Sequence, residues 1–406
     1  MNKGILGGLA AVLMGAATAL PAHAEFTDGV IKIGVLNDQS GTYSDLSGQG
    51  SVWAAKKAVE DYCKANKCDA KIEVIFGDHQ NKADIGAGIA RRWYDTEQVD
   101  VIVDTPTSSV ALAVSQITRE KNKVFLNSGA GASELTGTAC SPNFVHWTYD
   151  TWALAHGTGA AIVKQGGKTW FFLTADYAFG HALERDTAAV VKEMGGEVLG
   201  SVRHPFPAQD FSSFLLQAQA SGAQVIGLAN AGADTSNAIK QASEFGIVQG
   251  GQKLAGLLVF ITDVHALGLK TAQGLNFTTA WYWDTSDANR AFAKDFAAAN
   301  KGNHPSMVQA GVYSAVTHYL KAVFALGSDG DGVKVVEKMK SMPTDDKLFG
   351  KGEIRKDGRH IHPLLLVEVK KPADSKGPWD YYNIVTTIPA DEAFRPMSEG
   401  GCPLVK

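Results

Sequence analysis

The sequence predicts an α/β fold with parallel β-sheets, divided between two domains. Short apolar segments alternate with helical segments along most of the chain, and several of the short segments are apolar at consecutive positions. Strands buried on both faces have this composition, and strand–helix alternation produces parallel sheets with right-handed crossovers. Length is the third observation, because 406 residues exceed what one hydrophobic core usually organises.

The first 24 residues have the pattern of an export signal. Lys3 is their only charged residue, a small and apolar run covers 4–20, and Ala22, His23 and Ala24 form a small-x-small cleavage site. The run is shorter than the roughly 20 residues that cross a bilayer. We therefore expect a signal peptide over 1–24, cleaved after Ala24, rather than an uncleaved anchor. The remaining 382 residues have a formal net charge of −5, one below the −4 of the full chain, and should be soluble.

The predicted elements follow one another in two rounds of alternation, which close near 144–150 and 277–280. Helical patterns then resume, and the chain finishes with an antiparallel pair of strands. Glycines after several helical patterns are typical helix stops, and Asp210 and Asp234 are candidate N-caps. The expected strands are 30–36, 71–76, 100–103, 123–126, 169–173, 224–229, 253–259, 362–369 and 379–387; the expected helices after the first one are 82–97, 110–121, 182–194, 211–220, 235–245, 287–299, 306–326 and 333–342.

The charge and cysteine content argue against nucleic-acid binding and metal binding, and they favour disulfides. Charged residues make up 20% of the chain, and no basic block interleaves with aromatic residues, so we expect no nucleic-acid partner. An even number of cysteines in an exported chain favours disulfides. We expect Cys63 to pair with Cys68, and Cys140 with Cys402; four reduced thiols are the alternative. No CxxC motif is present and no histidine lies beside these pairs, so no metal site and no cofactor are expected.

Polar turns follow several predicted strands, at the edge where α/β domains hold small ligands. Ser40, Gly41 and Tyr43 follow the first strand. The hydroxyl and N–H groups of 104–109 lie at a helix start and suit an anionic oxygen. Either these groups contact a ligand, or one hydroxyl simply caps the helix. The single GxG in 127–133 is weak evidence for a cofactor, although its glycines allow a ligand close to the backbone.

Aromatic residues beside later turns suit an apolar ligand held between two domains, although internal packing would explain them equally well. They lie in 174–180 and 281–283, and the turn 230–234 follows another strand. No nucleophile elbow, P-loop, zinc or kinase motif is present, so we expect no enzymatic activity. His360 and His362 are interpreted as surface or hinge residues.

The segments IKIGVLNDQSGTYSD, DVIVDTPTSS, FLNSGAGASELTG, FFLTADYAFG and NAGADTSNAIKQASEFG together resemble the type I periplasmic solute-binding proteins. The most similar branch is the leucine/isoleucine/valine-binding group of ABC importers, which takes branched-chain amino acids or aromatic acids. The resemblance implies two Rossmann-like lobes joined by three hinge crossovers. It also implies a periplasmic location, an inner-membrane ABC permease as partner, and a monomer. The implied lobes are 25–149 with 281–360 and 150–280 with 361–390, and a tail of 391–406 returns toward the first lobe.

The resemblance also places a ligand site between the lobes, with the solute carboxylate held by the turns at 107–108 and 129–131. The amino-acid binders have a carboxylate opposite the ligand ammonium, in the segment 258–260; no acid occupies it here, and Asp263 is offset. Because a buried ammonium without a counter-charge is costly, the sequence favours a carboxylate with an apolar or aromatic body and no free α-amine. The expected ligand-binding residues are Tyr43, Leu46, Thr107, Ser108, Gly129, Gly131, Tyr177, Phe179, Asn230, Ala231, Phe260 and Trp281.

Three functions are compatible with these patterns. The first is a transport receptor, which would close on its ligand without turnover. The second is a soluble sensor that feeds a signalling receptor. The third is an exported hydrolase, which the missing nucleophile motifs argue against. We favour the transport receptor.

Overall fold

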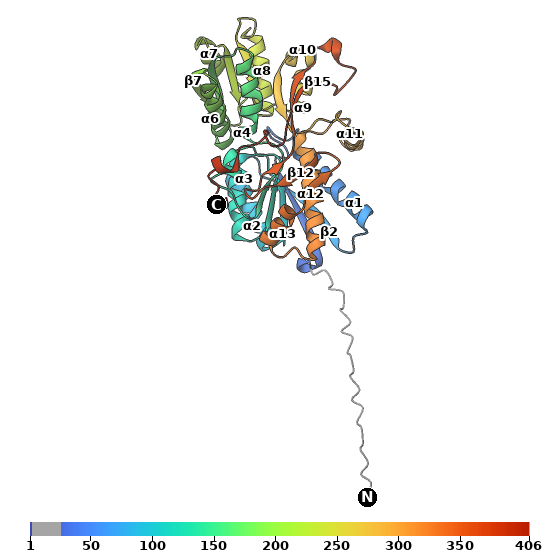
Figure 1. The fold of residues 1–406 in the computed structure, drawn as a ribbon. Helices are drawn as coiled ribbons and strands as arrows, with labels where there is room; N and C mark the ends of the chain where they lie inside the picture. The colour runs from blue at the N-terminus through green and yellow to red at the C-terminus, as the bar shows by residue number, and fades with distance from the viewer. Residues whose placement is uncertain (2–25, 406) are drawn as a thin grey trace.

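The computed structural model describes Met1 and residues 26–405 of the chain. The expected signal peptide and its cleavage site, apart from Met1, lie outside the described residues. Two lobes are stacked one on the other, with the first lobe below the second in Figure 1.

The first lobe is built on a five-stranded parallel sheet with the strand order β2-β1-β3-β4-β5. Strand β1 occupies an interior position and pairs in parallel with both β2 and β3. Strands β3 and β4 are buried at every position, which explains their consecutive apolar residues. The elements are β1 (Val30–Asn37), α1 (Gly48–Asn66), β2 (Lys71–Asp78), α2 (Ala83–Asp95), β3 (Val101–Asp104), α3 (Ser108–Glu120), β4 (Val124–Asn127), a 3-10 turn η2 (Ser133–Thr136) and β5 (Phe144–His146).

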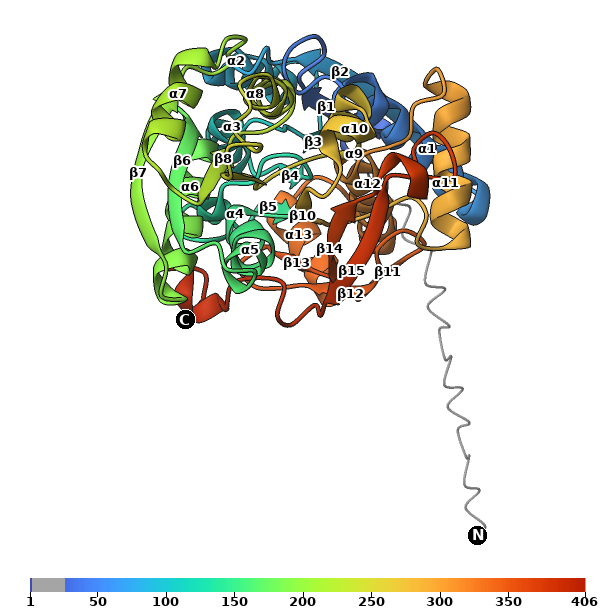
Figure 2. The same ribbon diagram turned by 90° about the horizontal axis from the view of Figure 1, so that it is seen from above.

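The second lobe contains a four-stranded parallel sheet with the order β7-β6-β8-β9. Seen from above in Figure 2, α6 and α7 lie near β7, whereas α9 and α10 lie toward the C-terminal strands. The elements are α4 (Thr151–Leu154), a π-helical turn η3 (Ala155–Gly159), α5 (Ala160–Lys164), β6 (Thr169–Ala175), α6 (Ala178–Glu193), β7 (Glu197–His204), α7 (Ser212–Ala220), β8 (Val225–Ala229), α8 (Ala233–Glu244), β9 (Lys253–Gly256), α9 (Ile261–Leu267) and α10 (Leu269–Ala272).

The last third of the chain contributes to both lobes. Strands β10, β14 and β15 form an antiparallel sheet in the upper lobe, and α12 packs against α1 in the lower one (Figure 1). The chain therefore passes between the lobes after β5, after β10, and between β13 and β14. The elements are β10 (Asn276–Thr279), α11 (Asp287–Ala299), α12 (Met307–Leu326), α13 (Gly332–Ser341), β11 (Thr344–Asp346), β12 (Gly350–Ile354), β13 (His360–Ile361), β14 (Leu364–Val369) and β15 (Tyr382–Ile388), with short 3-10 turns at Thr27–Gly29, Pro372–Asp374 and Met397–Glu399.

The predicted fold class, two α/β lobes with parallel sheets, is confirmed. Two of the predicted helix caps are wrong. Phe211 is the N-cap of α7, and Gly232 is the N-cap of α8. Asp210 Oδ1 instead accepts a hydrogen bond from the Ser212 N–H, 2.9 Å away. Asp234 lies inside the first turn of α8, because the chain enters this helix through a left-handed glycine.

His360 and His362 are not surface residues, because their exposed fractions are 0% and 1%. Both lie at the third passage between the lobes. The ring of His360 stacks on Trp147 with 4.2 Å between ring centroids. Nitrogens of both histidine rings lie 3.1 Å from the carbonyl oxygen of Trp147. Their position beside a crossover agrees with the hinge interpretation.

Two disulfides are present. The first joins Cys63 to Cys68 at the end of α1, and the second joins Cys140 to Cys402 and so ties the C-terminal tail to the first lobe. Among the described residues, no helix combines the length and the apolar character that a membrane span requires. The same residues contain no group of three or more His, Cys, Asp or Glu side chains arranged to hold a metal ion.

Candidate functional site

A small cavity lies between the two lobes, where segments that follow the C-terminal ends of the parallel strands meet. Side chains nearly fill it in this structure, and its volume is about 10 Å³. Such an edge is where α/β folds hold their ligands, because parallel strands and the following helix N-termini converge on it. The lining residues are Tyr43, Leu46, Pro106, Gly129 and Tyr149 of the first lobe, and Tyr177, Phe179, Ala231, Leu258 and Phe260 of the second.

Aromatic rings form most of the cavity wall and meet across the lobe boundary. Tyr149 and Phe260 approach edge to face, with 6.1 Å between ring centroids. Behind the cavity, the ring of Phe206 stacks on Tyr177 at 4.2 Å and lies 5.3 Å from Tyr43. Faces and edges of this kind are chemically suited to a flat apolar ligand.

Three tyrosine hydroxyls are the polar side-chain groups of the lining. The hydroxyls of Tyr43 and Tyr177 are hydrogen-bonded to each other, and the Tyr149 hydroxyl donates to the carbonyl oxygen of Gly129. Burial raises the pKa of Tyr43, Tyr149 and Tyr177 above the usual value for tyrosine. All three hydroxyls therefore stay protonated at neutral pH and remain able to donate.

Three helices begin beside the cavity: α3, α6 and α8. Their N-cap residues are Thr107, Tyr177 and Gly232, and none of these supplies a side-chain hydrogen bond to its own helix. The first-turn N–H groups of a helix without such a cap need another acceptor, and the helix dipole favours a negative one. The geometry is therefore suited to a carboxylate.

No carboxylate group lines the cavity among the described residues. Asp263 lies close by, but its Oδ2 accepts a hydrogen bond from the Phe260 N–H, 2.8 Å away, at the start of α9. Asp234 is also buried, and its Oδ1 accepts from the Ala208 N–H at 3.1 Å. Burial raises the pKa of each of these two carboxyl groups to about 7. Neither group faces the cavity as a partner for an ammonium ion.

The structure brings part of the predicted site together in the lining: Tyr43, Leu46, Gly129, Tyr177, Phe179, Ala231 and Phe260. Gly131 lies directly behind this wall, because a Cβ atom there would be 2.9 Å from Phe179 Cε2 and 3.0 Å from Tyr149 Cε2.

The other predicted residues lie outside the lining. The Thr107 hydroxyl donates to Asn81 Oδ1, and Ser108 Oγ accepts from the Ala132 N–H at 3.2 Å. Asn230 Oδ1 accepts from the Thr235 hydroxyl at 2.7 Å. Trp281 lines a neighbouring small cavity that shares Phe260 with the first one.

Pro106, Tyr149 and Leu258 line the cavity but were not among the predicted residues. Pro106 immediately precedes the predicted Thr107, and Leu258 lies in the segment 258–260, where the amino-acid binders have an acid. Tyr149 follows β5, where the chain first passes between the lobes. In the sequence, its place in the lining was indicated by an aromatic residue at a predicted crossover between the lobes.

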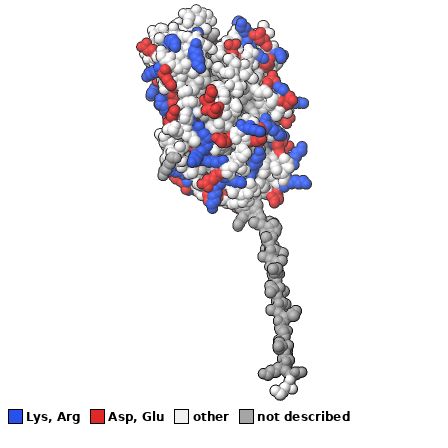
Figure 3. Space-filling model, in the orientation of Figure 1, with Lys and Arg blue, Asp and Glu red and all other residues white. Residues whose placement is uncertain are grey.

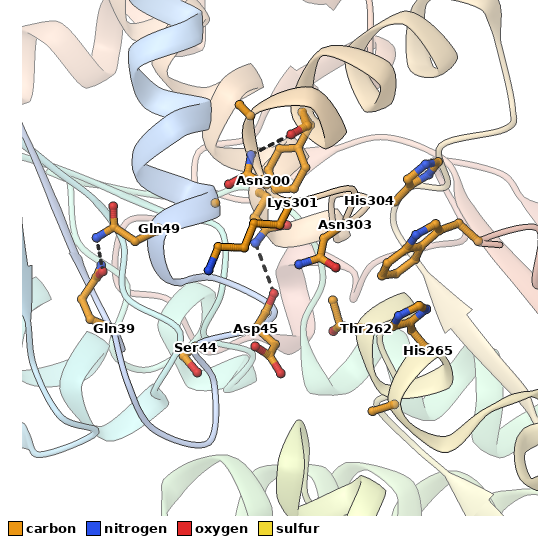
Figure 4. Close-up of a pocket in the computed structure, with 16 residues that line it drawn as sticks. Gln39, Ser44, Asp45, Gln49, Thr262, His265, Asn300, Lys301, Asn303 and His304 are labelled. Atoms are coloured by element: carbon orange, nitrogen blue, oxygen red, sulfur yellow. Dashed lines mark hydrogen bonds between the residues drawn. The ribbon is translucent and has the colours of Figure 1, made fainter.

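A larger cavity, of about 560 Å³, lies beside the first and is also formed by both lobes (Figure 4). Ser44 and Asp45, which line it, are neighbours of Tyr43 and Leu46. On the opposite wall the indole of Trp379 stacks on His265 and on His304, with ring centroids 3.9 Å and 5.3 Å away. The remaining labelled residues in Figure 4 are all polar or charged: Gln39, Gln49, Thr262, Asn300, Lys301 and Asn303.

Two α/β lobes with an aromatic-lined cavity between them define a class of proteins that bind a small molecule at the lobe boundary. A family model described as periplasmic binding protein matches residues 30–377, and the chain belongs to this family. The predicted resemblance is thus confirmed.

Solved structures support the same assignment. A periplasmic binding protein from Burkholderia mallei is 55% identical, with a TM-score of 0.90, and the match covers 94% of this chain and all of that one. A branched chain amino acid ABC transporter periplasmic ligand-binding protein from Burkholderia xenovorans LB400 is 40% identical, with a TM-score of 0.80 over 93% of this chain and all of that one. An ABC transporter solute-binding protein from R. palustris, solved in complex with benzoate, shares the fold at 22% identity, with a TM-score of 0.78 over 92% of this chain and all of that one.

Proposed function

We propose that this protein is an extracytoplasmic solute-binding receptor of an ABC importer. It captures a small carboxylate with an apolar or aromatic body between its lobes and delivers it to an inner-membrane permease. The observation that carries the proposal is the aromatic cavity at the lobe boundary, beside three helix N-termini without side-chain caps. The name of the Burkholderia xenovorans relative supports a role in ABC transport.

The chemistry of the lining favours an acid without an α-amino group. Uncapped N–H groups suit a carboxylate, and the rings of Tyr149, Phe179 and Phe260 suit a flat apolar body. No acid in the lining balances an ammonium ion, which is costly to bury alone. An aromatic carboxylate meets these requirements better than a branched-chain amino acid does.

The lobes of the proposed receptor move as 25–149 with 281–360 against 150–280 with 361–390. The three passages between the lobes are then the hinges, and the ligand favours closure because it contacts both lobes. We also propose that the protein acts as a monomer in the periplasm, without catalytic activity, after cleavage behind Ala24. We propose no nucleic-acid partner, since on the face in Figure 3 positive and negative side chains are interspersed rather than gathered into one basic area.

Calorimetric titration tests the ligand class. Leucine, phenylalanine, benzoate and a hydroxycinnamate are each titrated into the protein after unfolding and refolding, which removes bound metabolites. We expect heat from one or both aromatic acids and none from leucine. Tight binding of leucine with none of the other three would contradict the proposed ligand class and leave an amino-acid receptor.

A further inference from the structure

Ser133 of the first lobe has its polar groups bonded to residues outside that lobe. Its N–H donates to Thr151 Oγ1 at 3.1 Å, and its carbonyl oxygen accepts from Arg395 Nη2 at 2.8 Å. Its hydroxyl donates to Asp186 Oδ2 at 2.8 Å and accepts from Arg185 Nη2 at 2.9 Å. Thr151, Arg185 and Asp186 belong to the second lobe, so Ser133 is a bridging point between the lobes.

Arg185 and Asp186 lie side by side on α6 and hold each other. Arg185 Nε donates to Asp186 Oδ1 at 2.9 Å, and Thr151 Oγ1 donates to Asp186 Oδ2 at 2.6 Å. Arg185 also forms an ion pair with Glu134, the residue after Ser133. The Asp186 carboxylate is one-tenth exposed, whereas the side chains of Arg185 and Glu134 are 52% and 32% exposed.

Burial decides which of these contacts matters most. An ion pair as exposed as that of Arg185 and Glu134 contributes little, because water and salt screen it. Ser133 is 1% exposed, and its hydroxyl is hydrogen-bonded to the mostly buried Asp186 carboxylate. Hydrogen bonds of this kind are stronger than neutral ones. The bond from Ser133 to Asp186 is therefore the main contact between the turn 129–133 and helix α6.

This bridge is continuous with the ligand cavity but does not line it. Ser133 ends the turn that contains Gly129 and Gly131, and the carbonyl oxygen of Gly131 accepts from the Thr151 N–H at 2.8 Å. Residues 129–133 are thus fixed to the second lobe at two successive points. Separation of the lobes would break the contacts of Ser133 with α6 and expose the turn 129–133 to water.

We propose that Asp186 and Arg185 are positioning residues for ligand capture, which hold Ser133 and keep the turn 129–133 against the second lobe in the closed arrangement. This inference rests on the proposed function, because it assumes that the lobes close around a solute. Contacts present only in the closed state increase its population, and apparent affinity rises with the fraction of binding-competent molecules.

Two substitutions test the bridge from its two ends: Asp186→Ala and Ser133→Ala. Asp287→Ala is the control, because Asp287 pairs with Arg290 on the surface of α11. Titration with benzoate and with each other acid that binds the wild type should give a dissociation constant about tenfold higher in either variant, the size of one lost hydrogen bond to a charged group. The dissociation constant should rise by the same factor for every acid. The double variant should bind no more weakly than either single variant, and the control should bind as the wild type does.

Interlobe distances provide a second measurement that needs no ligand. Spin labels are placed at Glu60 on α1 and at Leu216 on α7. Pulsed electron paramagnetic resonance then measures the distribution of distances between the two labels. We expect both variants to lose short distances without ligand, and to reach the wild-type distance with saturating acid. Unchanged affinity together with an unchanged distribution would overturn the inference, as would a factor that differs between acids, which indicates direct ligand contact. If no acid binds the wild type, the proposed function fails, and the ligand-free distributions alone decide the role of the bridge.

Discussion

The hydroxyl groups of Tyr43 and Tyr177 are hydrogen-bonded to each other across the lobe boundary. Tyr43 follows β1 of the first lobe, and Tyr177 immediately precedes α6 of the second. Both rings pack on Phe206. The pair therefore joins the two halves of the cavity, and it forms only when the lobes are in contact.

Tyr177→Phe should weaken ligand binding about three- to tenfold, the effect of one neutral hydrogen bond that the closed state loses. Titration calorimetry with the best-binding acid measures the change. Tyr94→Phe is the control, because the Tyr94 hydroxyl bonds to Thr118 within the first lobe. That variant should lower thermal stability and leave affinity unchanged. Equal losses of affinity in the two variants would contradict a specific role of the Tyr43–Tyr177 pair.

Gly131→Ala should prevent complete closure. The new Cβ atom would lie 2.9 Å from Phe179 Cε2, on the opposite lobe, so the lobes must move apart. Overpacking of this kind costs about 1–3 kcal/mol, and affinity should fall by about tenfold or more. Gly88→Ala on α2 is the matched control, since nothing lies within 4 Å of its Cβ position. Wild-type affinity in Gly131→Ala would show that the closed complex differs from this arrangement.

Thr107→Ala should weaken ligand binding by about 1–3 kcal/mol, because Asn81 Oδ1 loses its donor and the chain of contacts that leads to Tyr43 is broken. In this structure the Thr107 hydroxyl donates to Asn81, whose side-chain amide donates to Asp38 Oδ2 at 2.6 Å. Asp38 in turn accepts from the Tyr43 N–H at 2.8 Å. Thr107→Ser should keep the binding that Thr107→Ala loses. If calorimetry finds unchanged affinity in the alanine variant, Thr107 does not belong to the site.

Asp234→Asn should remove a pH dependence of stability. Burial raises the Asp234 pKa from 3.8 to about 7, so the folded state holds a proton that the unfolded chain releases. The wild type therefore loses stability as pH rises from about 4 to about 7, by about 1.4 kcal/mol per pH unit from this group. Denaturant unfolding at pH 5, 6, 7 and 8 measures the difference between wild type and variant. A difference that does not change with pH would mean that the folded-state pKa is not raised.

The sequence predicted the buried strands well, because their apolar residues are consecutive. Strand β8, for example, is buried at every position and was expected over 224–229. Strand β7 was missed because it lies at the sheet edge, where exposed and half-buried residues alternate and no continuous apolar run is needed. Asp210 and Asp234 have the right residue type for caps, but the backbone path into a helix decides which residue becomes the cap.

Site residues were predictable where they follow a strand with a characteristic turn, as Gly129 and Phe179 do. Tyr149 was not, because its place in the lining depends on how the chain crosses between lobes. Thr107 and Ser108 show a different limit: their hydroxyls were expected on a ligand, but in this structure Thr107 donates to Asn81 and Ser108 Oγ accepts from the Ala132 N–H. Hydrogen-bond partners far apart in sequence cannot be derived from spacing alone.

Small-angle scattering combined with calorimetric titration of the same sample tests the central claim most directly. The account predicts that an aromatic acid such as benzoate binds one molecule per chain with measurable heat, and that the radius of gyration decreases as it binds. No heat and an unchanged radius of gyration with leucine, phenylalanine, benzoate and a hydroxycinnamate would contradict the claim that the lobes close on a small carboxylate.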